Sequence, residues 1–144
     1  MFVSLQVMLP IEIKENRILI SVLNWGMGHV SRSIGLIHQL LEQENIVFIA
    51  CSIEQEEIYK QYFNSIQFIR HNGYPFKFGG KGNFAWDLFK VLFKLKKRMK
   101  REQKEVEAMI EKYSIDLVLS DHRYGFYSPI VQSYFITHQF NLPV

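Results

Sequence analysis

Cysteine is nearly absent from this sequence, since Cys51 is the only one in 144 residues. A single thiol cannot form an intrachain disulfide or build a zinc cluster of several cysteines. A disulfide-stabilised secreted fold is therefore excluded, and a reducing compartment is expected. Cys51 ends an apolar run, which favours a buried and inert thiol.

Signatures of targeting, metal binding and acyl chemistry are also missing. The apolar start, Met1–Ile13, has no basic segment, no small-residue cleavage site, and too few residues to cross a bilayer. We expect residues 1–16 to form an N-terminal extension, and the cytoplasm is the default location. The five histidines are scattered, so no metal site is predicted. No Gly-x-Ser-x-Gly elbow is found.

Acidic residues are scarce in one long segment. Eight of the 17 lysines and arginines lie between Lys90 and Lys104, against the single acid Glu102. Apolar residues at helical spacing predict one helix over Phe84–Tyr113. Its apolar first half and basic middle suit peripheral contact with an anionic membrane, at the inner face of the plasma membrane. The residues expected to make that contact are Trp86, Phe89, Phe93, Lys96, Lys97, Arg98 and Lys100.

Two other interpretations of this helix remain. It could be a core helix with a solvated basic end, which is equally compatible with the pattern. Nucleic-acid binding is the weaker competitor, because no recognised binding module accompanies the charge and the net charge is only +3. We therefore expect no nucleic-acid partner.

Strand and helix patterns alternate along the chain. Between the first two strands, Val30 and Ile37 belong to an apolar stripe that predicts a helix. A capping box at Ser52 and Gln55 predicts the start of a second helix. That helix should bury Ile58 and Tyr62 and end near Phe63. The expected strands are Arg17–Leu23, Ile46–Cys51, Ile66–Arg70, Leu117–Ser120 and Tyr134–Thr137.

This alternation predicts a single α/β domain, a Rossmann-like doubly wound parallel sheet over residues 17–144. The sheet order should start at the first strand, move outward and then reverse. A crevice then opens between the first and fourth strands at their carboxyl ends, where ligands bind in such folds. Three polar segments fall on that edge: Asn24–His29, Asp121–Gly125, and His138 with Gln139.

The first of these segments is a glycine-containing turn before a helix. Gly26 and Gly28 permit a tight turn and a close backbone approach, and the helix N-terminus suits a phosphate or diphosphate. An ordinary tight turn is the alternative. His29 at the helix start is expected to stay neutral and act as a general base, or else to cap the helix. Asp121 could serve as a second base or bind a hydroxyl, or merely cap a turn.

The remaining residues of this edge are candidate ligand contacts. Arg123 could pair with a diphosphate bidentately or lie solvated at the surface. Asn24, Tyr124 and Gly125 belong to the same turns as the candidates above. His138 and Gln139 could bind a ligand or only a neighbouring loop.

Three motifs in order resemble those of bacterial GT-B glycosyltransferases related to the lipid-linked N-acetylglucosaminyltransferase of peptidoglycan synthesis. They are Arg17-Ile-Leu-Ile-Ser-Val-Leu-Asn-Trp-Gly-Met-Gly-His-Val-Ser-Arg32, Ser120-Asp-His-Arg-Tyr-Gly125 and Phe135-Ile-Thr-His-Gln139. The resemblance covers most of the chain from Arg17 onward. It implies that the chain is the N-terminal, acceptor-side half of a GT-B fold.

The resemblance also implies an activity, the transfer of a sugar from a nucleotide-diphosphate donor to a hydroxyl acceptor, possibly lipid-linked. The donor is a substrate, so no cofactor is expected. His29 corresponds to the family's candidate base. The sequence stops at Val144 without the donor domain of such enzymes, so we expect a missing or separate donor-binding domain and little activity from this chain alone.

Other functions stay open at this point. A subunit of a split glycosyltransferase would receive its donor domain from a second polypeptide. A non-catalytic membrane-surface or nucleotide-binding module would transfer no sugar at all. A nucleotide-sugar epimerase would share the same architecture.

Overall fold

The chain folds around one five-stranded sheet. The computed structural model describes residues 13–24, 27–72 and 84–136. All strand pairs are parallel and the order is β3-β2-β1-β4-β5. The elements are β1 (Arg17–Val22), α1 (Met27–Glu42), β2 (Ile46–Cys51), α2 (Ile53–Tyr59), β3 (Gln67–Arg70), α3 (Phe84–Tyr113), β4 (Leu117–Asp121) and β5 (Gln132–Ile136).

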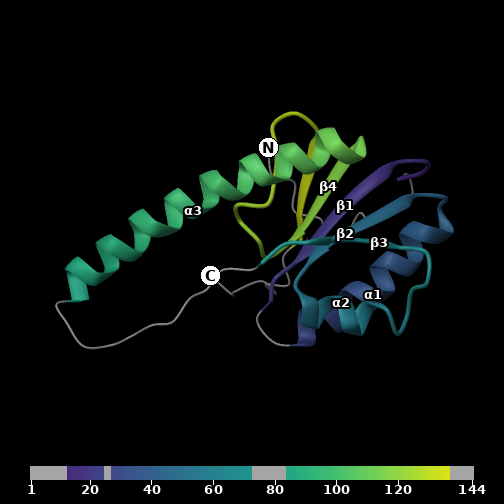
Figure 1. The fold of residues 1–144 in the computed structure, drawn as a ribbon, viewed down its shortest axis with the longest axis horizontal. Helices are drawn as coiled ribbons and strands as arrows, with labels where there is room; N and C mark the ends of the chain where they lie inside the picture. Colours follow the sequence, from purple (N-terminus) through teal and green to yellow (C-terminus); the bar gives the residue numbers. More distant parts are fainter. Residues whose placement is uncertain (1–12, 25–26, 73–83, 137–144) are drawn as a thin grey trace, which may run out of the picture.

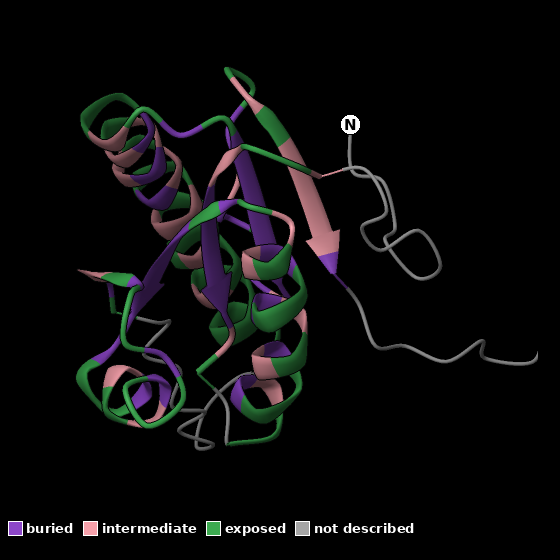
Figure 2. Cartoon of the chain, turned by 90° about the vertical axis from the view of Figure 1, so that its right-hand side faces the viewer, coloured by how far each residue is buried: buried purple, intermediate pink, exposed green. Residues whose placement is uncertain are grey.

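The predicted doubly wound fold and its reversal after the third strand are confirmed. β1 lies between β2 and β4, with Ile20 paired to Ile49 on one side and Leu119 on the other. The three central strands are almost wholly buried, whereas β5 is only half-buried along most of its length (Figure 2). Their continuous apolar runs follow from this burial, because helices cover both faces of the sheet.

Two apolar clusters hold the layers together. On one face, α1 and α2 pack against the sheet, with Ile37, Leu40 and Tyr59 fully buried. On the other face, Val106 and Ile110 of α3 pack against Leu19 and neighbouring strand residues. Figure 1 shows α1 and α2 on the opposite side of the sheet from α3.

The second helix starts as predicted and ends differently. The backbone N–H of Gln55 donates to Ser52 Oγ at 3.3 Å, and the Ser52 N–H donates to Gln55 Oε1 at 3.2 Å. The helix ends at Tyr59, before the predicted end near Phe63. The expected burial of Tyr62 is wrong: Tyr62 is 53% exposed, and Tyr59 takes the inward place, because Tyr62 lies in the turn after the helix.

The third helix has the predicted bounds but only its C-terminal half packs on the domain. Glu102, Val106 and Ile110 are buried, whereas Trp86 and Phe89 are more than half exposed. Figure 1 shows the N-terminal half of α3 extending beyond the sheet. Within residues 13–24, 27–72 and 84–136, no helix combines the length and apolar character needed to cross a membrane.

Candidate functional site

The carboxyl ends of β1 and β4 meet at one edge of the sheet. The Leu23 N–H donates to the Asp121 carbonyl at 3.0 Å, which ties the turn before α1 to the end of β4. The His122 N–H donates to the Ile136 carbonyl at 3.2 Å and ties the same point to β5. The turn after β1 and the ends of β4 and β5 therefore meet at the sheet edge where the sequence predicts ligand binding.

A cluster of two histidines and one aspartate lies at this edge. Asp121 Oδ1 is 3.4 Å from His29 Nδ1 and 2.8 Å from His122 Nδ1. The two imidazole rings meet edge to face, with centroids 5.1 Å apart. Asp121 is 4% exposed, so its carboxylate is held inside the fold beside both rings. We call these three residues the His–Asp–His cluster.

The protonation of His29 is set mainly by burial. Burial lowers the pKa of His29, and the nearby Arg32 lowers it further, while the Asp121 carboxylate acts in the opposite direction. The expected neutral imidazole is thus supported, although by burial rather than by the helix N-terminus invoked from the sequence. A neutral ring at pH 7 can accept a proton or a metal ion.

His122 is the member of the cluster that sequence reasoning missed. Its backbone has φ 53, in the left-handed region that few non-glycine residues adopt. Such strain is often found at functional sites. The signal was present in the sequence, because His122 directly follows Asp121 in the motif that carried the family resemblance. Its ring position depends on the local backbone, which the sequence did not reveal.

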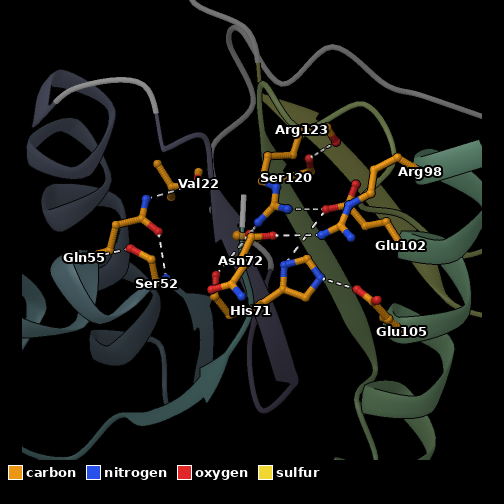
Figure 3. A network of polar contacts seen from close by, with 12 residues as sticks. Val22, Ser52, Gln55, His71, Asn72, Arg98, Glu102, Glu105, Ser120 and Arg123 are labelled. Carbon is orange, nitrogen blue, oxygen red and sulfur yellow. Dashed lines mark hydrogen bonds and ion pairs between the residues drawn. The ribbon is translucent and has the colours of Figure 1, made fainter. Parts of the chain in front are cut away.

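Arg123 does not occupy the position predicted for it. Its side chain is 2% exposed, so the solvated interpretation is wrong. The guanidinium pairs with the buried Glu102 of α3, and Nη1 donates to Ser21 Oγ at 2.7 Å. Figure 3 shows this guanidinium directed into the interface between the sheet and α3. Two of its nitrogen atoms therefore bond to Glu102 and Ser21 within the fold.

His71 completes this buried polar network on the α3 side of the sheet. Its Nε2 is 2.9 Å from Glu105 Oε2, and its Nδ1 is 4.0 Å from Glu102 Oε1 (Figure 3). Burial and the neighbouring Arg123 lower the pKa of His71. The network joins β3, α3 and the segment after β4.

The other residues predicted to contact a ligand differ in how far they are exposed. Asn24 is exposed in the turn after β1, and Gly28 is exposed in the first turn of α1. After β4, Tyr124 is 57% exposed with its ring 4.9 Å from Phe135, while Gly125 is buried. Three further residues predicted to contact a ligand, Gly26, His138 and Gln139, lie outside the described residues.

A Cβ at Gly28 would not clash with its surroundings. Its nearest neighbour would be Arg32 Nη2 at 3.9 Å, an ordinary contact with a flexible side chain. Packing therefore does not require glycine here. The absence of a side chain keeps the backbone of the first helical turn accessible beside the His–Asp–His cluster.

The cluster also has the composition of a metal site. One donor atom from each of His29, Asp121 and His122 lies within 4.8 Å of the donor atoms of the other two. We expected no metal site from the sequence because the histidines are far apart along the chain. His29 is 92 positions from Asp121, so no spacing rule would have joined them.

The predicted membrane-contact residues divide into two groups. Trp86, Phe89 and Phe93 are 63–68% exposed, and Lys96, Lys97 and Lys100 are exposed on the same helix. Ala85, Trp86 and Phe89 line an open hollow of about 250 Å³. Arg98 is different, because it is half-buried and its Nη2 donates to the Asn72 carbonyl at 3.4 Å. We therefore remove Arg98 from the exposed cationic set.

Comparisons with known proteins leave the family open. No protein-family model matches the chain, and no curated protein or solved structure matches it either.

Proposed function

We propose that this domain is the acceptor-side domain of a glycosyltransferase that moves a sugar from a nucleotide-diphosphate donor to a hydroxyl acceptor. The observation that carries the proposal is the pairing of His29 with Asp121, whose Nδ1 and Oδ1 atoms lie 3.4 Å apart. The pair lies at the carboxyl ends of β1 and β4, where doubly wound folds bind ligands. The resemblance of the three sequence motifs supports the same activity.

The chemistry assigns a different task to each partner. With the His29 Nδ1–H directed to Asp121, Nε2 carries the lone pair that takes a proton from the acceptor hydroxyl. The acceptor oxygen then forms a bond to the anomeric carbon, and the bond from that carbon to the diphosphate oxygen breaks. The nucleoside diphosphate leaves with the electron pair. Asp121 stabilises the imidazolium that forms.

The N-terminus of α1 supports binding of the leaving group. The first-turn N–H groups of a helix and its dipole favour negative charge. The exposed Gly28 backbone lies in that turn, next to His29. A donor-binding domain would supply the opposite wall of the site, either from the same polypeptide or from a second one in a split enzyme. The reaction would take place in the cytoplasm.

The proposal is tested on the protein as its native cells produce it. An affinity tag on the chromosomal copy recovers the polypeptide with any extension or partner, and its intact mass is measured first. The preparation is then assayed for release of nucleoside diphosphate from a panel of nucleotide sugars, with lipid extract and soluble hydroxyl acceptors.

Variants at the pair decide the outcome. We expect His29→Ala to lower transfer by about 10²–10⁴-fold, the usual contribution of a general base. Asp121→Asn should also lower transfer, while the exposed control His38→Asn should not. Thermal unfolding of each variant checks that the fold is kept. Absence of transfer from every nucleotide sugar, or full activity in a folded His29→Ala protein, would refute the proposal.

A second candidate function, binding to an anionic membrane surface, is favoured by the exposed half of α3. We propose that Trp86, Phe89 and Phe93 enter the lipid interface while Lys96, Lys97 and Lys100 attract anionic headgroups. The three aromatic side chains are 63–68% exposed. Large aromatic side chains usually stabilise a protein core or an interface by being buried there. A lipid-linked acceptor would place the domain at such a surface.

Vesicle sedimentation separates this function from non-specific attraction. Binding to vesicles with anionic lipid should fall when Lys96, Lys97 and Lys100 are changed to Gln. A charge-matched control changes the exposed Lys14, Lys60 and Lys112 to Gln and should bind more tightly than the first variant. Equal binding by the two triple variants would refute a specific lipid-contact surface on α3. Binding that survives His29→Ala without any sugar transfer would favour a non-catalytic membrane module.

A further inference from the structure

The His–Asp–His cluster has properties that proton transfer alone does not require. A base and its orienting carboxylate are two groups, yet Asp121 Oδ1 is also 2.8 Å from His122 Nδ1. Two imidazoles and one carboxylate converge from two segments of the chain. Imidazole nitrogen with one carboxylate oxygen is a donor set that suits zinc and similar divalent transition metals.

We propose that His29, Asp121 and His122 bind one divalent transition-metal ion of the zinc class, with a coordination position left open for an anionic oxygen ligand. The metal site is an alternative state of the residues proposed for sugar transfer, because an ion bound at His29 Nδ1 would replace the proton that this atom directs to Asp121. The open position would take a phosphate oxygen, a carboxylate or a hydroxide.

One separation between donor atoms matches that expected around such an ion, and a second is shorter. Zinc–ligand distances of about 2.0–2.1 Å place tetrahedral ligand atoms about 3.3 Å apart. The His29–Asp121 and His122–Asp121 separations are 3.4 Å and 2.8 Å. All three donor atoms lie within 4.8 Å of one another. The 2.8 Å separation is that of a hydrogen bond, so His122 and Asp121 would move apart by about 0.5 Å to share a metal ion.

Burial and backbone geometry support the same site. The side chains of His29 and His122 are 17% and 18% exposed, and that of Asp121 is 5% exposed. The cluster is shielded but can be reached from solvent. Buried carboxylates are commonly paired or metal-bound, and a divalent cation would add positive charge beside Asp121. The left-handed backbone at His122 holds its ring against the preceding residue, Asp121.

The number of ligands determines the class of site. Structural zinc is usually held by four protein ligands, whereas catalytic zinc keeps three and leaves a fourth position for water or substrate. The cluster provides three. The open position would therefore lie at the sheet edge, near the exposed Asn24 and the first turn of α1. The same helix N-terminus favours an anion there.

The test measures metal binding directly and needs no activity. The full chain is dialysed against a chelator and titrated with Zn²⁺ by calorimetry, and with Co²⁺ by visible absorption. We expect one equivalent of Zn²⁺ per chain and Co²⁺ bands of a site with nitrogen and oxygen ligands. Mg²⁺ should not displace the ion, because imidazole donors favour transition metals.

Two variants and one control test the ligands. His122→Asn and Asp121→Asn should each weaken Zn²⁺ binding by at least about tenfold. Even a change to a residue that only hydrogen-bonds to a metal ligand usually weakens binding by this factor. The exposed His38→Asn is the matched control and should bind as the wild type does. Asparagine tolerates the left-handed backbone at position 122. Unchanged Zn²⁺ affinity in both His122→Asn and Asp121→Asn, or less than half an equivalent bound by the wild type, would overturn the proposal.

His122→Asn also separates this inference from the proposed function. The variant keeps His29 and Asp121, the pair proposed for proton transfer. Sugar transfer retained together with lost Zn²⁺ binding would support the metal site and show that transfer does not need the ion. Full Zn²⁺ binding by the wild type with no transfer from any donor would support the metal site and refute the transferase.

Discussion

The Arg123 guanidinium lies against the Glu102 carboxylate, and both side chains are almost completely buried, at 2% and 0% exposed. The pair connects the segment after β4 to the middle of α3. Ser21 of β1 accepts a further hydrogen bond from the same guanidinium. A buried charge pair of this kind fixes how α3 sits on the sheet.

Removing one member of this pair should be costly. Arg123→Met leaves the Glu102 carboxylate buried without its guanidinium, and we expect the free energy of unfolding to fall by about 3–5 kcal/mol. The double variant Arg123→Met with Glu102→Leu should recover most of the loss. Urea unfolding of the two single variants and the double variant measures the coupling. Simple additivity of the two single effects would contradict a direct interaction.

His71 should make the fold sensitive to acid. Its pKa is lowered in the folded state, first by burial and then by Arg123, against the opposing carboxylates of Glu102 and Glu105. A lowered histidine pKa stabilises the fold fully above the unfolded value of about 6.5. That contribution is lost as the pH falls from about 6.5 through the folded pKa. The limiting slope is about 1.4 kcal/mol per pH unit for one proton.

Urea unfolding between pH 5 and 8 provides the measurement. His71→Gln should flatten the fall in stability below about pH 6.5. The two proteins differ only at position 71, so the difference between their pH profiles reports on His71. An identical pH dependence in wild type and variant would show that His71 is not the group responsible.

Two glycines of α1 offer a matched pair of substitutions. A Cβ at Gly35 would meet nothing within 4 Å, and one at Gly28 would meet only Arg32 Nη2 at 3.9 Å. Gly35→Ala should raise the free energy of unfolding by about 0.5–1 kcal/mol, because alanine loses less backbone entropy. Gly28→Ala should also keep the fold. If the backbone at position 28 approaches a diphosphate, only Gly28→Ala should weaken binding of UDP or GDP, as followed by calorimetry on the native preparation.

The two halves of α3 should respond differently to truncation. Trp86 is 64% exposed, so Trp86→Ala should change the free energy of unfolding by no more than about 0.5 kcal/mol. Ile110 is 6% exposed and packs against the sheet, so Ile110→Ala should cost about 2–5 kcal/mol. Thermal or urea unfolding compares them. A large loss from Trp86→Ala would mean that the N-terminal half of α3 packs against the domain in solution.

Local patterns predicted most of the fold. The aliphatic runs identified the central strands because burial on both faces leaves no polar alternation. The Ser52–Gln55 capping box fixed the start of α2, since both of its hydrogen bonds lie within four residues. The end of α2 was misjudged, and Tyr59 rather than Tyr62 is buried. Helix ends depend on packing as well as on local sequence.

The candidate site was only half predictable. The sequence indicated that His29 and Asp121 lie at the same edge of a parallel sheet, because strand order places the first and fourth strands together. The contact of the His122 ring with Asp121 and the burial of Arg123 were not predictable. The left-handed backbone at His122 interrupts the alternation of a strand, so the pattern no longer tells which way the next side chain points.

The sequence by itself therefore determined the central strands, the positions of the helices and their order around a parallel sheet, through hydrophobic periodicity and short-range capping. The start of β5 at Gln132, two residues before the predicted Tyr134, was not determined in this way. Tertiary structure alone decided which polar groups meet. It brought His29 within 3.4 Å of Asp121 across 92 positions, and it paired Arg123 with Glu102 inside the fold. The physical reason is range: periodicity reports the surroundings of each segment, whereas a site depends on distances between atoms far apart in the chain.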